Sequence, residues 1–169
     1  MTLLKYSFAL PPPAAPAPQP EARHEYPYSE FLLELPARWR QVPVQEDDTL
    51  NFVSDADGAA IIISADFFDI PDDKAQDIAE QVLDSRIKVL QTASHGQVRL
   101  LHRDIRPHPS GGGLELSFAA EAQGEHVHLH LGYVTARKVL NFSMVCRPGA
   151  SEAIALFNAC VPGFRPRLP

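Results

Sequence analysis

Four strand-like runs follow one another in the second half of the chain, and they constrain its fold more than any other feature. The runs span residues 97–106, 113–122, 125–135 and 138–146. The connections between them are too short to hold a crossover helix, so consecutive strands are expected to pair antiparallel. This half of the chain is therefore predicted to form an antiparallel meander.

A β-hairpin and a long helix are predicted before the meander. Residues 49–54 and 59–67 are apolar runs joined by Asp55-Ala56-Asp57-Gly58, and Asp-Gly between two such runs is typical of a hairpin turn. The three isoleucines at 61–63 are apolar on both faces, which predicts a central strand. A helix is expected to begin near Pro71 and to end at Ser94-His95-Gly96. Its apolar stripe recurs every three or four residues: Ile78, Ala79, Val82, Leu83, Ile87 and Leu90.

These elements predict an α+β domain. We expect an antiparallel β-sheet of about six to seven strands, in the order hairpin–helix–meander–helix, with two helices packed on it. The second helix is predicted at residues 151–161, the domain at 28–162 and a tail at 163–169. The chain has 169 residues, 45% of them hydrophobic and 21% charged, which is enough for a core of its own.

Proline is concentrated near the N-terminus. The chain contains 16 prolines, about twice the usual ~5% share, and six of them lie between residues 11 and 20. Proline fixes φ and lacks an N–H group, so residues 11–27 are predicted to be an extended Pro/Ala-rich linker. In residues 1–10, Tyr6, Phe8 and Leu10 alternate with other residues, which predicts a strand or arm that joins a sheet edge.

Charge and hydropathy exclude several classes of protein. Fifteen Lys and Arg against 21 Asp and Glu give a net charge of −6, which is unfavourable for binding nucleic acid through its phosphates. No apolar run approaches the ~18 residues of a membrane span. The N-terminus does not resemble a signal peptide, so a cytoplasmic protein is expected, or a periplasmic one if the N-terminus is incomplete.

The two cysteines and the single tryptophan are candidates for a disulfide bridge or for contact with a partner protein. Cys146 and Cys160 are too few for a disulfide framework and lack zinc-type spacing. We interpret them as buried thiols, with a single Cys146–Cys160 bridge as the alternative. Trp39 is the only tryptophan, and it is either part of the core or an anchor for a partner protein.

The strand at 125–135 carries an unusual set of histidines. His126, His128 and His130 alternate with apolar residues, so their imidazoles share one face at intervals of about 7 Å. Two of them could ligate a metal ion with help from a neighbouring strand, and all three could form a pH-sensitive face that contacts a partner, or a plain polar face. The opposite face, beginning with Val127 and Leu129, is the expected core face. The sequence marks no catalytic or cofactor-binding residue.

The start of the domain carries a resemblance to a known family. Phe31-x-Leu33-x-Leu35-Pro36-x-x-Trp39 combines a strand with a following proline and tryptophan. With the hairpin, long helix, meander and last helix, it resembles the PsbP-like superfamily over about residues 28–162. That superfamily includes the PsbP subunit of photosystem II, a Ran-binding nuclear import factor, DcrB-type bacterial lipoproteins and the Eag chaperones of type VI secretion.

The resemblance implies a sheet with helices on it, no catalytic machinery, and binding to another protein. The cytoplasmic bacterial branch that this chain resembles includes chaperones that shelter hydrophobic segments of secreted effectors, generally as dimers. The leading hypothesis is therefore a non-enzymatic protein-binding module, a secretion-associated chaperone or adaptor, with a homodimer as one assembly. The alternative is a metal- or small-ligand-binding protein that uses the His-x-His-x-His strand.

Overall fold

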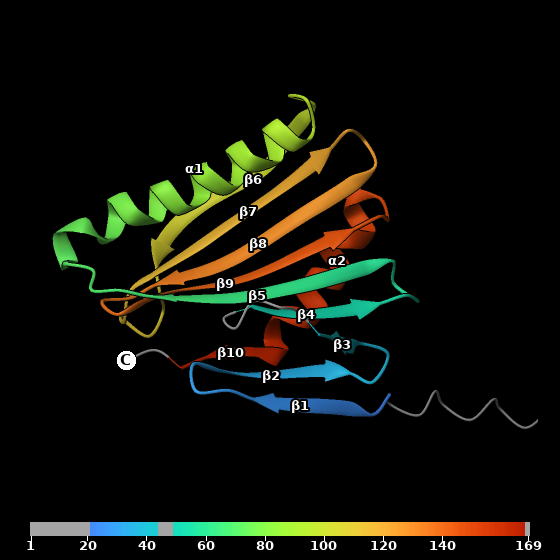
Figure 1. Cartoon of the computed structure of the whole chain (residues 1–169), viewed down its shortest axis with the longest axis horizontal. Coiled ribbons are helices and arrows are strands. Elements are labelled where there is room, and N and C mark those ends of the chain that lie inside the picture. The colour runs from blue at the N-terminus through green and yellow to red at the C-terminus, as the bar shows by residue number, and fades with distance from the viewer. Residues whose placement is uncertain (1–20, 44–48, 168–169) are drawn as a thin grey trace, which may run out of the picture.

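The computed structural model describes residues 21–43 and 49–167, and its strands form two antiparallel sheets (Figure 1). The strands are β1 (Arg23–Pro27), β2 (Phe31–Pro36), β3 (Arg40–Val42), β4 (Thr49–Ser54), β5 (Ala59–Phe67), β6 (Val98–Pro107), β7 (Leu114–Ala122), β8 (His126–Val134), β9 (Lys138–Cys146) and β10 (Phe164–Pro166). The helices are α1 (Ala75–Ala93) and α2 (Ala150–Cys160), with 3₁₀ turns η1 (Asp72–Lys74) and η2 (Val161–Gly163). The arm predicted at residues 1–10 lies outside the described residues.

The larger sheet has seven strands in the order β3-β4-β5-β9-β8-β7-β6, and every neighbouring pair is antiparallel. Strands β6 to β9 are the predicted meander, and β4 and β5 are the predicted hairpin. Gly58 closes the hairpin turn with a φ of 59°, a left-handed conformation that glycine adopts without steric cost. The hairpin joins the meander through β5 and β9, so the isoleucines of β5 lie inside the sheet, as predicted. The α+β fold class is confirmed.

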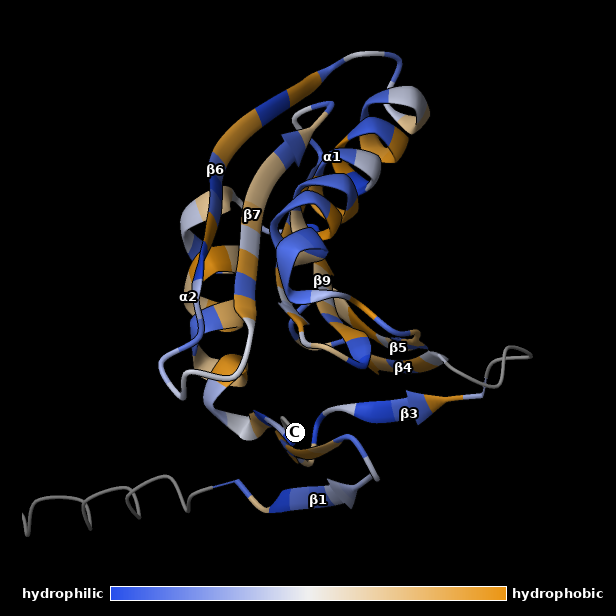
Figure 2. Ribbon diagram, turned by 90° about the vertical axis from the view of Figure 1, so that its left-hand side faces the viewer, coloured by the Kyte–Doolittle hydropathy of each residue, from blue (hydrophilic) through white to orange (hydrophobic). Residues whose placement is uncertain are grey.

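The two helices lie on opposite faces of this sheet (Figure 2). Alternate side chains of a strand point to opposite faces, so β8 directs Leu129 toward α2 and His128 toward α1. The core on the α2 side includes Phe142 and Met144 of β9, which are fully buried. The core on the α1 side lies between the helix and β7, and it contains Ala79, Leu83, Leu90, Leu116, Phe118 and Ala120.

A second sheet covers the rest of the α2-side core, and it corrects two predictions about the ends of the domain. Its strand order is β1-β2-β10. The predicted linker at 11–27 was wrong for residues 23–27, which form β1, and the predicted tail at 163–169 was wrong for residues 164–166, which form β10. Both strands pair with β2, one along each of its edges. Strand β2 itself buries the apolar side chains that its alternating pattern predicts.

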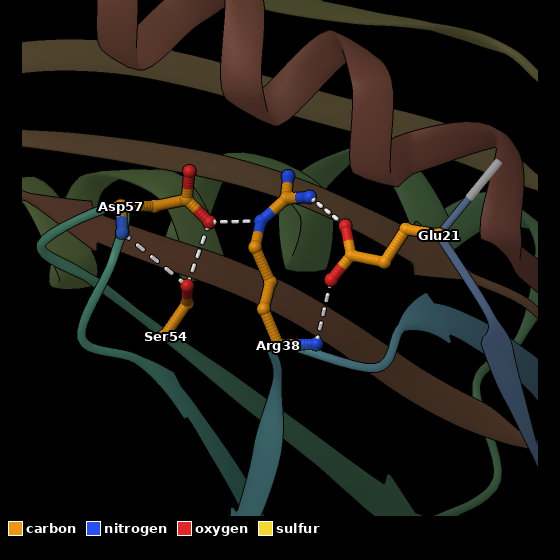
Figure 3. Close-up of polar contacts among 4 residues, drawn as sticks. All are labelled: Glu21, Arg38, Ser54 and Asp57. Atoms are coloured by element: carbon orange, nitrogen blue, oxygen red, sulfur yellow. Dashed lines mark hydrogen bonds and ion pairs between the residues drawn. The ribbon is translucent and has the colours of Figure 1, made fainter. Parts of the chain in front are cut away.

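An ion-pair cluster joins the two sheets (Figure 3). The guanidinium of Arg38, which lies between β2 and β3, contacts the carboxylates of Glu21 and Asp57, and the Arg38 backbone N–H donates to Glu21 over 2.9 Å. The hydroxyl of Ser54 donates to Asp57 over 2.6 Å. One arginine therefore fixes the start of the small sheet against the β4–β5 turn of the large sheet.

Candidate functional site

Among the described residues, helix α1 covers only part of the width of the large sheet on its side. Helix α1 packs mainly on β7, with β6 and β8 beside it, and buries the stripe of apolar residues that its sequence predicts. Strands β9, β5 and β4 continue the sheet beyond β8. A helix is about 10 Å wide and strands lie about 4.8 Å apart, so one helix cannot cover seven strands.

A cavity of about 920 Å³ lies between α1 and the uncovered part of this face. We call it the α1 groove. Its principal lining residues come from β5, α1, β8 and β9 and from the segment after β5: Ile62, Phe68, Arg86, Val89, His128 and Ser143. Three of its apolar side chains are exposed, with relative exposures of 39% for Ile62, 43% for Phe68 and 69% for Val89. Apolar side chains exposed together in one groove are typical of an interaction site.

Polar side chains on adjacent strands lie at the floor of the groove, where Asn141 and Ser143 line it, and beneath it, where His130 is enclosed. His130 lies opposite Ser143, with its Nδ1 atom 2.9 Å from the hydroxyl, and the Asn141 amide donates to the hydroxyl of Ser64 over 3.3 Å. Among the described residues, His130 Nε2 and Asn141 Oδ1 are buried without a hydrogen-bond partner. Buried polar atoms are usually paired. The core on the α2 side also contains a buried atom without a partner in the described chain, Trp39 Nε1, so this feature is not confined to the groove.

Gly132 provides the space that the buried imidazole needs. Gly132 is two residues after His130 in β8 and lies opposite Asn141 of β9, and a Cβ atom at this position would lie 2.9 Å from His130 Nε2. The ring of His130 stacks on Phe118, with 5.4 Å between the ring centroids. A side chain at residue 132 would therefore displace the imidazole from a fully enclosed position.

The structure separates the three predicted histidines. His130 is fully buried, His128 lines the α1 groove, and His126 is half-buried at the start of β8. Burial lowers the pKa of His128, with a smaller contribution from His126, and burial and then the charge of Arg86 hold the pKa of His130 well below its usual 6.5. Across residues 21–43 and 49–167, no group of three or more His, Cys, Asp or Glu side chains could hold a metal ion. Burial therefore favours the neutral imidazole at His128 and at His130.

We expect His130 to make stability depend on pH. Its folded-state pKa is lowered, so below about pH 6.5 the unfolded chain binds a proton that the folded chain excludes. The free energy of unfolding should therefore fall as the pH falls below about 6.5, by up to about 1.4 kcal/mol per pH unit from this residue. Urea unfolding between about pH 7.5 and about pH 5 measures this slope. His130→Gln should flatten it and His24→Gln, at an exposed position, should not; equal slopes for all three proteins would contradict the assignment.

The remaining predicted residues lie in the core on the α2 side. Trp39 is 2% exposed and packs in the cluster with Phe142, so its side chain is not presented to a partner. Cys146 and Cys160 are both buried and unbridged. Burial is the largest cause that raises the pKa of each thiol, to about 11 in both cases.

We expect both thiols to be unreactive in the folded protein. A buried thiol of high pKa has little of the nucleophilic thiolate form near pH 8. Ellman's reagent should therefore modify Cys146 and Cys160 at least about 100-fold more slowly in the native protein than in the urea-unfolded chain. Rapid modification of either residue under native conditions would contradict the enclosed positions described above.

Arg86 and the groove itself were not predicted from the sequence. Arg86 lies four residues after Val82 and four before Leu90, so a cation interrupts the apolar stripe of α1. That interruption was the sequence signal from which Arg86 could have been predicted as a candidate site residue. The position of the groove could not be found in the same way, because it depends on which strands α1 leaves uncovered.

The two sheets, the α1 face and the α2 face together define an α+β domain of the PsbP-like fold. The solution structure of cyanobacterial PsbP (CyanoP) from Synechocystis sp. PCC 6803 is similar, with a TM-score of 0.58, 18% identity, and coverage of 86% of this chain and 92% of that one. A crystal structure from Bacteroides thetaiotaomicron VPI-5482 matches 87% of this chain and 48% of its own, with a TM-score of 0.48 and 11% identity. No family model and no curated protein matches the chain. The CyanoP structure supports the fold named by the resemblance, and this support does not extend to the secretion-chaperone branch.

Within the described part of the chain, none of the helices combines the length and the hydropathy needed to cross a membrane.

Proposed function

We propose that this chain is a non-enzymatic binding domain that holds an apolar helical segment of a partner protein in the α1 groove. One observation carries the proposal: within residues 21–43 and 49–167 no helix covers β9 and β5 on the α1 side of the sheet, and apolar side chains are exposed on both sides of the gap. Ile62 and Phe68 lie on one side and Val89 of α1 on the other. Burial of such side chains favours association by about 25 cal/mol per Å² of apolar surface removed from water.

The geometry of the groove favours a helix as its occupant. Its floor is the face of a sheet whose backbone groups already pair with neighbouring strands, and its wall is a helix with its own hydrogen bonds. The groove thus offers side chains and no strand edge, so a segment that enters it must satisfy its own backbone N–H and C=O groups. A helix does so, and packed helices lie 8–10 Å apart, which places a second helix beside α1 over β9 and β5.

A chaperone or adaptor would work by this kind of contact. The secretion-associated role and a homodimer rest on the family resemblance, and the cytoplasmic or periplasmic setting rests on the N-terminal sequence. All three remain proposals. The alternative of a small-ligand protein shares the same groove. Its volume of about 920 Å³ lies within the range of about 300–1,000 Å³ that small-molecule pockets occupy, and His128 would then contact the ligand.

Selection of displayed peptides tests the proposal. A library of random peptides long enough for four helical turns is panned on the immobilised full chain, and the enriched sequences are measured by calorimetry. We expect enriched peptides with apolar residues at i, i+3, i+4 and i+7 and affinities on the order of micromolar. Failure to enrich a sequence family, or enrichment of peptides without helical periodicity, would overturn the proposal in favour of the small-ligand alternative.

A further inference from the structure

Arg86 is a cation in the wall of the α1 groove. It lies on the face of α1 that packs toward the sheet, between Val82 and Leu90 in the apolar stripe, and it lines the cavity with them. The charge of Arg86 contributes to the lowered pKa of His130, which is buried in β8 beneath the groove. The side chain is half-buried and therefore partly removed from water.

The guanidinium of Arg86 has no hydrogen-bond or ion-pair partner within residues 21–43 and 49–167. Two arginines of β6, by contrast, are paired: Arg103 contacts Asp84 of α1 over 3.0 Å, and Arg106 contacts Glu115. The carboxylate of Asp66, which also lines the groove, attracts Arg86 without forming an ion pair. The five N–H donors of Arg86 are therefore available to a group in the groove.

Desolvation gives this arrangement an energetic cost. Burial is the largest cause that lowers the pKa of Arg86, with Asp66 opposing it. A helix-surface arginine that only needed solvation would extend into water, whereas the side chain of Arg86 is half-buried and lines the groove. Charge-assisted hydrogen bonds to an anion offset such a cost, and the planar guanidinium matches a carboxylate in a bidentate geometry.

We infer that the occupant of the α1 groove presents one anionic group, such as a carboxylate, to Arg86. This inference rests on the proposed function, because it specifies the chemistry of the segment that the groove holds. The apolar body of the segment covers Ile62 and Val89, and its acidic side chain or carboxyl terminus lies against the guanidinium. Gln81 and Ser85, which line the same wall, are further hydrogen-bonding groups beside Arg86. Asp66 disfavours a second negative charge at its end of the groove.

Two fluorescent probes with one apolar framework separate the charge from the apolar contact. N-phenyl-1-naphthylamine is uncharged, and 8-anilinonaphthalene-1-sulfonate is the same framework with one anionic group. Both are titrated into the full-length wild-type chain and into Arg86→Gln, Arg86→Lys and Arg137→Gln. Arg137 is an exposed arginine in the β8–β9 turn and does not line the groove. Arg137→Gln therefore serves as a matched control, because it removes the same charge at a position outside the groove.

We expect Arg86→Gln to weaken binding of the sulfonate by about tenfold, which corresponds to about 1.4 kcal/mol, and binding of the neutral dye by less than about twofold. Arg86→Lys should retain part of the difference, and Arg137→Gln should change neither dye. Equal effects of Arg86→Gln on both dyes, or no effect on the sulfonate, would overturn the inference.

The same titrations keep this inference distinct from the proposed function. The neutral dye should bind wild-type protein and lose affinity for Ile62→Asp. If it does so while Arg86→Gln leaves the affinity for the sulfonate unchanged, the groove is an apolar site without anion recognition and only the inference fails. If neither dye responds to Ile62→Asp, the groove is not an apolar binding site and the proposed function fails with it.

Discussion

Replacing Trp39 by alanine is expected to lower the free energy of unfolding by about 3–5 kcal/mol. The indole is 2% exposed and packs in the cluster that joins the small sheet to the α2 side of the large sheet. Its loss would leave a cavity that the surrounding strands cannot fill, because β2 and β9 are held in register by their own pairing. An effect of this size is a large part of the stability of an ordinary domain.

Chemical unfolding followed by circular dichroism measures the Trp39→Ala effect. Phe67→Ala is the matched control, because Phe67 is also aromatic but is 59% exposed, and it should cost less than about 1 kcal/mol. A Trp39→Ala protein as stable as wild type would show that the indole is not a core residue. That result would favour the alternative interpretation, in which Trp39 is an anchor for a partner protein.

Ile62→Asp is expected to weaken binding of a selected helical peptide by at least about 30-fold, or about 2 kcal/mol. Ile62 lies on the floor of the α1 groove with 39% of its surface exposed, so a carboxylate there stays solvated in the free protein. Binding would bury that carboxylate beneath the apolar face of the peptide, which offers it no hydrogen-bond partner, and this desolvation is the source of the cost. The free energy of unfolding should change by less than about 1 kcal/mol, since the free side chain remains in water.

Leu100→Asp is the matched control for the groove. Leu100 of β6 is 46% exposed and lies outside the cavity, so the same change of residue class should leave the peptide affinity within about twofold. Calorimetry measures both variants. If Leu100→Asp weakens binding as strongly as Ile62→Asp, the peptide does not occupy the groove.

The sequence was most informative where contacts are local. The meander and the β4–β5 hairpin follow from alternating apolar residues joined by short connections, and α1 follows from its apolar stripe and the Gly96 that ends it. Strand β10 could not be found in this way. It is a three-residue strand with proline at its end, and it forms only because β2, far earlier in the chain, offers it an edge.

The histidine strand shows the same limit at the candidate site. Alternation correctly placed the imidazoles of His126, His128 and His130 on one face, opposite Val127 and Leu129. Which of them is enclosed depends on the position of α1, and the pattern within β8 carries no information about that helix. Arg86 is different, because a cation within an apolar helical stripe is visible in the sequence and can be weighed before a structure is known.

Backbone amide chemical shifts of the isotopically labelled domain, recorded during titration with a selected helical peptide, test the binding site most directly. The account predicts that the largest changes fall on Ile62, Val89 and Ser143, which line the α1 groove, and that the amides of α2 do not change. Changes concentrated on α2 or on the β6 edge would contradict the α1 groove as the binding site of this protein.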